Sequence, residues 1–387
     1  MPLDRHLCSR QLSHCGFSVQ DGSYLIRLWY GNCFALLKTW INEQAALQVF
    51  HNLSALQPAV RDVAAHYESL VSSALATALD PAALAAAGTR AAAAAAVGSG
   101  TTTARWRDEI WTRLSEACDS IYRSVLAVWH LQRVLAKKRD PVTHQPFLEA
   151  AFPVSDNNDD DEELLTHRFW KSLSKIASQQ FAQVHRNPNF LRDALVHGFP
   201  RLVSLFTALV QKIRSETTIR GIPVAIASGD EDVLLVALEP FMGDFLEGSM
   251  SRCLEAVDAV FKRSGSVGTS VPSRDSVHRV MAILETELDS VSGAEIPLAI
   301  AVARNVGKSL TALAEKMEML LQTGSSDARQ TSSSITGAQL HNISLVALAE
   351  AALGSIDRWS KQRTVPQLVR AALEQSVTAL ERVAQVL

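Results

Sequence analysis

The stretch ARWRDEIWTRLSEACDSIYRSVLAVWHLQRVLAKKRDP, residues 104–141, decides the fold of this chain. Its apolar residues recur at steps of three and four, the spacing that places side chains on one face of an α-helix. These residues are Trp106, Ile110, Leu114, Ala117, Ile121, Val125, Val128, Leu131 and Leu135. The pattern predicts a single long helix from Ala104 to Lys138, about 50 Å in length.

The carboxyl end of this helix carries three cations, Lys137, Lys138 and Arg139. Positive side chains at this end interact favourably with the helix dipole, and Asp140-Pro141 then stops the helix. The same run could contact anionic lipid, where each cation contributes on the order of 1 kcal/mol. Three cations are too few to anchor a protein alone, so the simpler interpretation is a charged helix terminus.

The same periodicity extends over most of the remaining chain, and no segment shows sustained strand alternation. Helical patterns cover 43–78, 163–186, 189–217, 231–263, 274–291, 297–322, 335–362 and 365–387, whereas the short apolar run 222–227 is ambiguous. Only 18 glycines and 13 prolines in 387 residues favour few tight turns. We therefore expect an all-α fold, either a bundle or an elongated stack of antiparallel helices.

The chain is expected to divide into four parts. They are a poorly defined amino-terminal segment at 1–41, a helical segment at 42–82, a flexible linker rich in Ala, Gly and Thr at 83–103, and a helical region at 104–387 with loops near 140–163, 264–273 and 323–334. The linker is predicted because its alanines are not accompanied by larger apolar residues that a helix could bury. The acidic run DNNDDDEE at 156–163 is expected to be a solvated loop.

Composition excludes several function classes. The 37 Lys and Arg residues nearly balance the 40 Asp and Glu residues, and no basic stripe with interleaved aromatics is present, so nucleic acid is not an expected partner. The five cysteines form no Cys-x-x-Cys pair, and no two of the 11 histidines have the spacing that places two metal ligands on one helix face. We expect no catalytic residue, cofactor or metal, and a soluble cytosolic chain.

A phosphate-binding loop is suggested only by Gly307-Lys308-Ser309. Such a loop needs a glycine five residues earlier, where its backbone curls around phosphate, and this position is Val302. The run 298–313 also has uninterrupted helical periodicity. The tripeptide is therefore predicted to be an ordinary exposed part of a helix.

Candidate partner-contact residues lie on the long predicted helix. Trp111 and Trp129 lie beside its apolar stripe, so they could cover a neighbouring helix or contact another protein. Packing in the core is the simpler interpretation, because large aromatic side chains are usually buried. Together with Lys137, Lys138 and Arg139, these tryptophans make up the candidate partner contact.

Several strings along the chain resemble one known family. His130–Pro141, HLQRVLAKKRDP, closely resembles the HLQKVLAKKRDP signature of the conserved oligomeric Golgi complex subunit 5 family. Further similar strings follow the order of that family: ALQVFHNL at 46–53, LEPF followed by FL and SMSR at 238–252, AVARNVGK at 301–308, and TGAQLHNI at 336–343. The resemblance extends from about residue 42 to the end, and the chain is expected to be a middle fragment.

The resemblance implies an elongated all-α rod that acts as a non-catalytic subunit of a Golgi vesicle-tethering complex in intra-Golgi retrograde transport. The implied partners are other subunits of that complex, especially subunit 7 within the lobe of subunits 5 to 8. The implied location is the cytosol and the cytosolic face of Golgi membranes, with peripheral attachment through the complex. The alternatives are a helical scaffold or adaptor of a related membrane-tethering complex, and an enzyme with a helical fold.

Overall fold

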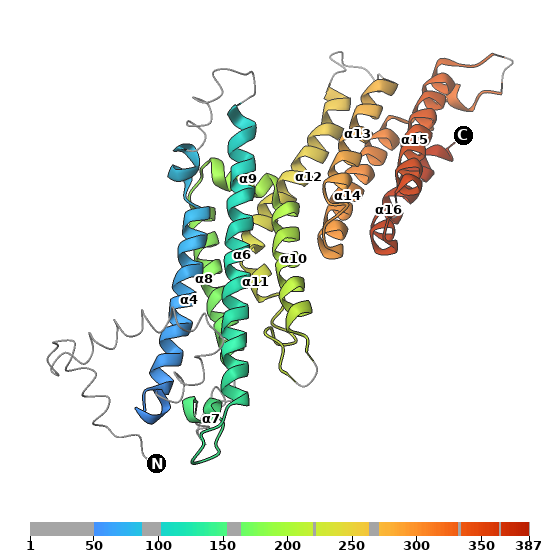
Figure 1. Cartoon of the computed structure of the whole chain (residues 1–387). Helices are drawn as coiled ribbons and strands as arrows, with labels where there is room; N and C mark the ends of the chain where they lie inside the picture. The colour runs from blue at the N-terminus through green and yellow to red at the C-terminus, as the bar shows by residue number, and fades with distance from the viewer. Residues whose placement is uncertain are drawn as a thin grey trace. The chain divides into compact units, whose positions relative to one another are not determined.

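The computed structural model describes residues 50–86, 102–152, 164–219, 222–262, 271–331, 334–363 and 365–386. In these ranges the chain is helical with connecting loops and contains no strand, and an isolated bridge pairs Arg139 with Pro146 (Figure 1). The prediction of an all-α fold is confirmed. The expected amino-terminal segment 1–41, residues 87–101 of the expected linker and the acidic run 156–163 lie outside the described residues.

The long helix predicted from the deciding stretch is α6, Thr102–Lys137, which has 36 residues and is about 54 Å long. Ile110, Leu114 and Val125 of its predicted apolar stripe are fully buried. The chain divides into two compact units, one formed by 1–67 with 127–166 and the other by 68–126 with 167–387. The three boundaries fall within α4, Leu56–Ala78, within α6, and near the start of α8, Leu165–Arg186.

The first unit has a small apolar core. Its fully or almost fully buried side chains include Val60 of α4, Val128 and Leu135 of α6, and Phe147 of the short helix α7, Phe147–Ala151. The ring of His51 lies 5.2 Å from that of Phe147. A core of this kind holds the end of α6 and the loop that follows it in place.

The second unit contains α8, Leu165–Arg186, from His167 onward, followed by α9, Phe190–His197, and α10, Phe199–Thr217. The periodic stretch 189–217 therefore forms two helices, which meet at Gly198 with a bend of 74°. Trp111 of α6 explains why glycine stands at the bend, because a Cβ atom there would lie 2.3 Å from Cζ2 of the tryptophan ring. Among the described residues, no single helix has the length and apolar composition needed to cross a membrane, and α9 and α10 meet those criteria only when taken together across their bend.

The ambiguous apolar run 222–227 belongs to an irregular segment rather than to a strand. The short helix α11, Val233–Val236, follows it. Ala225 and Ile226 are buried in this segment. The buried hydroxyl of Thr217, at the end of α10, accepts a hydrogen bond of 3.2 Å from the backbone N–H of Ala225. An apolar run can therefore be buried without forming a regular element.

The rest of the second unit is a stack of helices. They are α12, Glu239–Lys262; α13, Arg274–Ser290; α14, Ile296–Leu320; α15, Gly337–Gln362; and α16, Gln367–Ala384, with the short 3-10 helix η2, Asp327–Arg329, between α14 and α15. The successive pairs α12–α13, α13–α14 and α15–α16 pack together, and α14 also packs against α12 and α16 (Figure 1). The prediction of stacked antiparallel helices is confirmed here.

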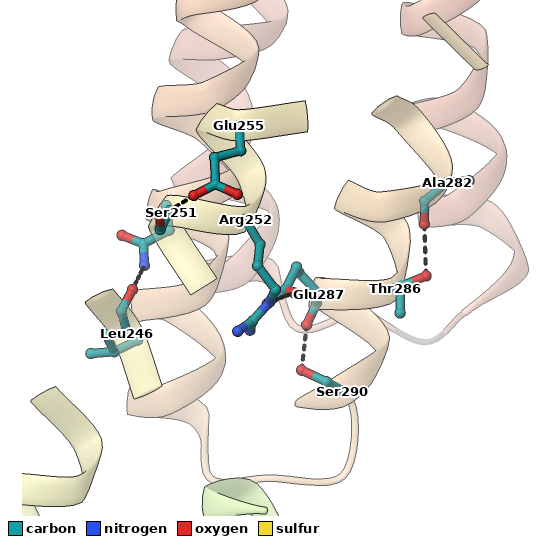
Figure 2. Close-up of polar contacts among 9 residues, drawn as sticks. Leu246, Ser251, Arg252, Glu255, Ala282, Thr286, Glu287 and Ser290 are labelled. Atoms are coloured by element: carbon teal, nitrogen blue, oxygen red, sulfur yellow. Dashed lines mark hydrogen bonds and ion pairs between the residues drawn. The ribbon is translucent and has the colours of Figure 1, made fainter. Parts of the chain in front are cut away.

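One apolar cluster and several polar contacts connect this stack. Val257 of α12, Val306 and Leu313 of α14, and Leu345 of α15 belong to the cluster and are almost completely buried. Arg252 of α12 donates two hydrogen bonds, of 2.7 and 2.9 Å, to the carboxylate of Glu287 on α13 (Figure 2). The hydrogen bond to Glu287 raises the pKa of Arg252. Polar contacts of this kind fix how each helix is aligned along its neighbour.

The bend at Gly198 yields a first prediction. Gly198→Ala should lower the free energy of unfolding by about 1–3 kcal/mol, because the added methyl group must displace the Trp111 ring. In a Trp111→Ala background the same change should cost much less, since the obstructing ring is gone. Urea denaturation of the four proteins in this cycle measures the coupling between the two positions.

Gly243→Ala is the matched control for this cycle. Gly243 lies inside α12, and no atom lies within 4 Å of the position that its Cβ would take. This replacement should leave stability unchanged or raise it by up to about 1 kcal/mol. Equal effects of Gly198→Ala with and without Trp111 would contradict the packing argument.

The Arg252–Glu287 pair yields a second prediction. The Glu287 side chain is only 9% exposed, so Arg252→Met should leave a largely buried carboxylate without its cation. The expected loss of stability is about 1.5–3 kcal/mol, the range for hydrogen bonds to charged groups. Lys361→Met is the control, because Lys361 and Asp357 form an exposed pair within α15 that should contribute at most about 1 kcal/mol. Equal losses in both variants, measured by urea denaturation, would refute the assignment.

Candidate partner interface

The cations of the candidate contact lie at the end of α6 and at the start of the loop that follows. Lys137 is the last residue of α6 and is exposed, Lys138 is half-buried and Arg139 is exposed. The chain then reverses direction, because the backbone N–H of Phe147 donates to the carbonyl of Lys138 at 3.0 Å. We call residues 137–147, the last residue of α6 and the turn that follows it, the basic hairpin.

Asp140 organises the basic hairpin from within. Its buried carboxylate accepts hydrogen bonds from the backbone N–H groups of Val142 and Thr143, at 3.2 and 2.7 Å, and from the Thr143 hydroxyl at 2.9 Å. The imidazole Nε2 of His51 lies 3.8 Å from the other carboxylate oxygen. An aspartate that bonds to backbone N–H groups two and three residues later is typical of a turn with a defined conformation. The hairpin therefore has a fixed shape.

The outer surface of the hairpin is basic with an apolar tip. Val142 at the tip is 84% exposed. The Arg139 guanidinium donates a hydrogen bond of 3.1 Å to the carbonyl of His144, and His144 has a left-handed backbone conformation with φ of 59°. Within the described parts of the chain, Lys137, Lys138 and Arg139 form no ion pair. Their charges are available to an acidic surface.

The structure places the two candidate tryptophans differently from the cations. Trp129 is only 2% exposed and lies beneath Arg133, whose guanidinium carbon is 4.6 Å from the ring centre. Trp111 belongs to the second unit, where it is half-buried against Gly198 and lies beneath Arg201, with 4.8 Å between the guanidinium carbon and the ring centre. These positions favour core packing for Trp129 and helix packing for Trp111, so the structure groups only Lys137, Lys138 and Arg139.

Sequence reasoning missed two residues that support this site, Gln132 and Asp140. The buried side-chain carbonyl of Gln132 accepts hydrogen bonds from the backbone N–H of Thr166, at 2.8 Å, and from its hydroxyl. A buried polar group needs such partners, so a glutamine within the predicted apolar helix was the available signal. In the string HLQRVLAKKRDP, Gln132 and Asp140 are buried and make structural contacts, whereas Lys137 and Arg139 are exposed and Lys138 is half-buried.

The described residues contain no cluster of three or more His, Cys, Asp or Glu side chains that could hold a metal ion. Burial raises the pKa of Cys118 to about 12 and that of Cys253 to about 11. Both thiols therefore stay protonated near neutral pH and are poor nucleophiles. Gly307, Lys308 and Ser309 lie inside α14, as predicted, but only Lys308 is exposed. The expected exposure was wrong for Gly307 and Ser309, which are buried, and the Cβ position of Gly307 lies against α16. The Ser309 hydroxyl donates to the carbonyl of Asn305 at 3.1 Å.

Comparisons with known proteins agree with the resemblance noted in the sequence. The family model described as "Conserved oligomeric Golgi complex subunit 5, C-terminal" matches residues 42–210. Subunit 5 of this complex from Arabidopsis thaliana is 29% identical over 307 residues, which cover 77% of this chain and 35% of the relative. Subunit 5 from Mus musculus is 28% identical over 331 residues, which cover 78% of this chain and 39% of the relative.

A subunit 5 from Dictyostelium discoideum is 20% identical over 142 residues, which cover 27% of this chain. No solved structure matches the chain significantly. The chain spans little more than a third of the length of the plant and mouse relatives. Because two relatives with the same name cover more than three quarters of this chain and the family model overlaps them, the sequence resemblance is confirmed. The chain is similar to conserved oligomeric Golgi complex subunit 5 over most of its length.

Proposed function

We propose that this chain acts as a non-catalytic subunit of the conserved oligomeric Golgi complex and contributes to vesicle tethering in intra-Golgi retrograde transport. The observation that carries this proposal is the match to subunit 5 over 77% and 78% of the chain in two distant organisms. The alternative is a helical scaffold of a related membrane-tethering complex. The coverage and the shared name of the relatives favour subunit 5.

Physical features of the chain support a binding role. The buried side chains of Gln132, Asp140 and Glu287 are occupied by hydrogen bonds that hold loops and helices together. Unpaired charge is found instead on outer surfaces such as the basic hairpin. A stack of helices with such surfaces can bind other helices without changing them chemically.

The proposed partners are other subunits of the complex, with subunit 7 first among the lobe of subunits 5 to 8. The basic hairpin is the proposed contact, since its fixed shape costs little conformational entropy when a partner binds. Its cations would face acidic side chains on that partner. The proposed location is the cytosolic face of Golgi membranes, with attachment through the complex rather than through this chain alone.

Charge reversal tests the hairpin contact. Lys137→Glu with Lys138→Glu should reduce recovery of subunit 7 in co-purification from cells several-fold, because attraction to an acidic surface becomes repulsion. Partners are identified and quantified by mass spectrometry. The wild-type chain should recover other subunits of the complex under the same conditions.

The matched control reverses two exposed cations elsewhere, Arg61→Glu on α4 with Arg274→Glu on α13, and should leave recovery unchanged. Unchanged recovery of subunit 7 by the hairpin variant would remove the hairpin from the proposal. If the wild-type chain recovered no subunit of the complex, the proposed function itself would be wrong.

A further inference from the structure

Helices α14 and α16 border an open groove of about 720 Å³ in the second unit. On α14 the groove extends from Ile300 to Glu315, about four helical turns or 22 Å. An open channel of this length differs from the enclosed pockets that surround small ligands. Its dimensions suit an elongated, rod-shaped occupant.

The floor of the groove is formed where the two helices approach most closely. Gly307 of α14 is buried against α16, and a Cβ atom at this position would lie 3.2 Å from the backbone carbonyl oxygen of Ala372. Other small residues also line the groove, among them the half-buried Ala312 on α14 and the exposed Ala371 on α16. The floor is thus close to the backbone and accepts a ridge of side chains from outside.

The walls of the groove combine apolar and charged side chains. Leu368 of α16 is 61% exposed and lines the groove. Arg304 and Lys308, one turn apart on α14, are exposed and form no ion pair with any described residue. Glu315, about two turns beyond Lys308, is also exposed and lines the groove. The groove therefore presents two cations followed by an anion beside a floor that includes Gly307 and the buried Ser376.

We propose that this groove binds an amphipathic α-helix of a partner protein. The partner helix would insert a ridge of Ala and Leu side chains into the floor, in the helix-in-groove manner. Two carboxylates one turn apart on that helix would face Arg304 and Lys308, and a cation two turns further along would face Glu315. Charge complementarity of this pattern sets the register and the direction of the helix.

This inference rests on the helix-mediated assembly proposed above, but it assigns a different face of the chain. The basic hairpin belongs to the first unit and the groove to the second. Binding at either face can therefore be tested while the other is left intact. Gly307 and Lys308, which resemble part of a phosphate-binding loop, line this groove instead.

A labelled helical peptide of about 18 residues tests the groove with the full-length chain. The probe carries an Ala and Leu ridge, two glutamates one turn apart and an arginine two turns beyond, and fluorescence polarisation reports its binding. Arg304→Glu with Lys308→Glu should weaken binding at least about tenfold. Ala371→Trp, which fills the groove without changing charge, should weaken binding to a similar degree.

Two controls separate the groove from general electrostatics. Arg370→Glu with Arg382→Glu reverses two exposed cations of α16 that do not line the groove, and it should leave affinity within about twofold of wild type. A peptide with the opposite charges, two lysines and one glutamate, should bind the Arg304→Glu, Lys308→Glu variant better than it binds wild type. Circular dichroism confirms that each variant remains helical.

Several outcomes would overturn the proposal. They are absence of peptide binding to the wild-type chain, equal weakening by both double charge reversals, and unchanged binding to the Ala371→Trp variant. A dimer in light scattering that Ala371→Trp dissociates would show that the occupant is a second copy of this chain, which also contradicts it. If the groove fails while the wild-type chain still recovers subunits of the complex, the proposed function stands without this site.

Discussion

The burial of one apolar stripe on each helix is the constraint on which the rest of this structure depends. The backbone of a helix forms its hydrogen bonds within the helix. Its apolar stripe of side chains must still be buried against another element. On α14, the side chains of Val302, Val306, Leu310 and Leu313 are at most 1% exposed. The helices that pack against α14 bury apolar side chains of their own in the same way. Each helix then has other faces that packing does not use. Those faces are available for contacts with other proteins.

Apolar contacts alone do not determine how far one helix slides along the next, since they are not directional. The buried polar groups supply this information. The carboxylate of Glu287 accepts two hydrogen bonds from Arg252, and Asp289 near the end of α13 accepts a bond of 2.9 Å from the indole N–H of Trp359 on α15. In the first unit, Gln132 and Asp140 do the same for the start of α8 and for the basic hairpin. These groups connect fold to function, because they set the position of the exposed charges nearby.

The sequence was sufficient to predict what depends on local periodicity. It predicted α6 from Ala104 to Lys138, against Thr102–Lys137 in the structure, and it predicted helix rather than a phosphate loop at Gly307. Gly198-Phe199-Pro200 indicates a break between helices in the sequence. The angle of 74° could not be predicted, because the reason for the glycine is the ring of Trp111, far away in the sequence. The roles of Gln132 and Asp140 depend on Thr166 and on a turn, and the groove depends on which helices become neighbours. Contacts between distant residues account for each of these omissions.

The string AVARNVGK at 301–308 shows how packing and binding are divided within one segment. Packing accounts for Val302, Ala303 and Val306, which are buried, and for Gly307, which allows α16 to approach. Asn305 is also accounted for, since its amide donates a bond of 2.9 Å to the carbonyl of Leu246 on α12. Arg304 and Lys308 are exposed and unpaired, so nothing in the fold of the chain requires a cation at either position. Two like charges one turn apart on a helix repel each other slightly. An anionic partner helix in the groove, as proposed, would offset this repulsion.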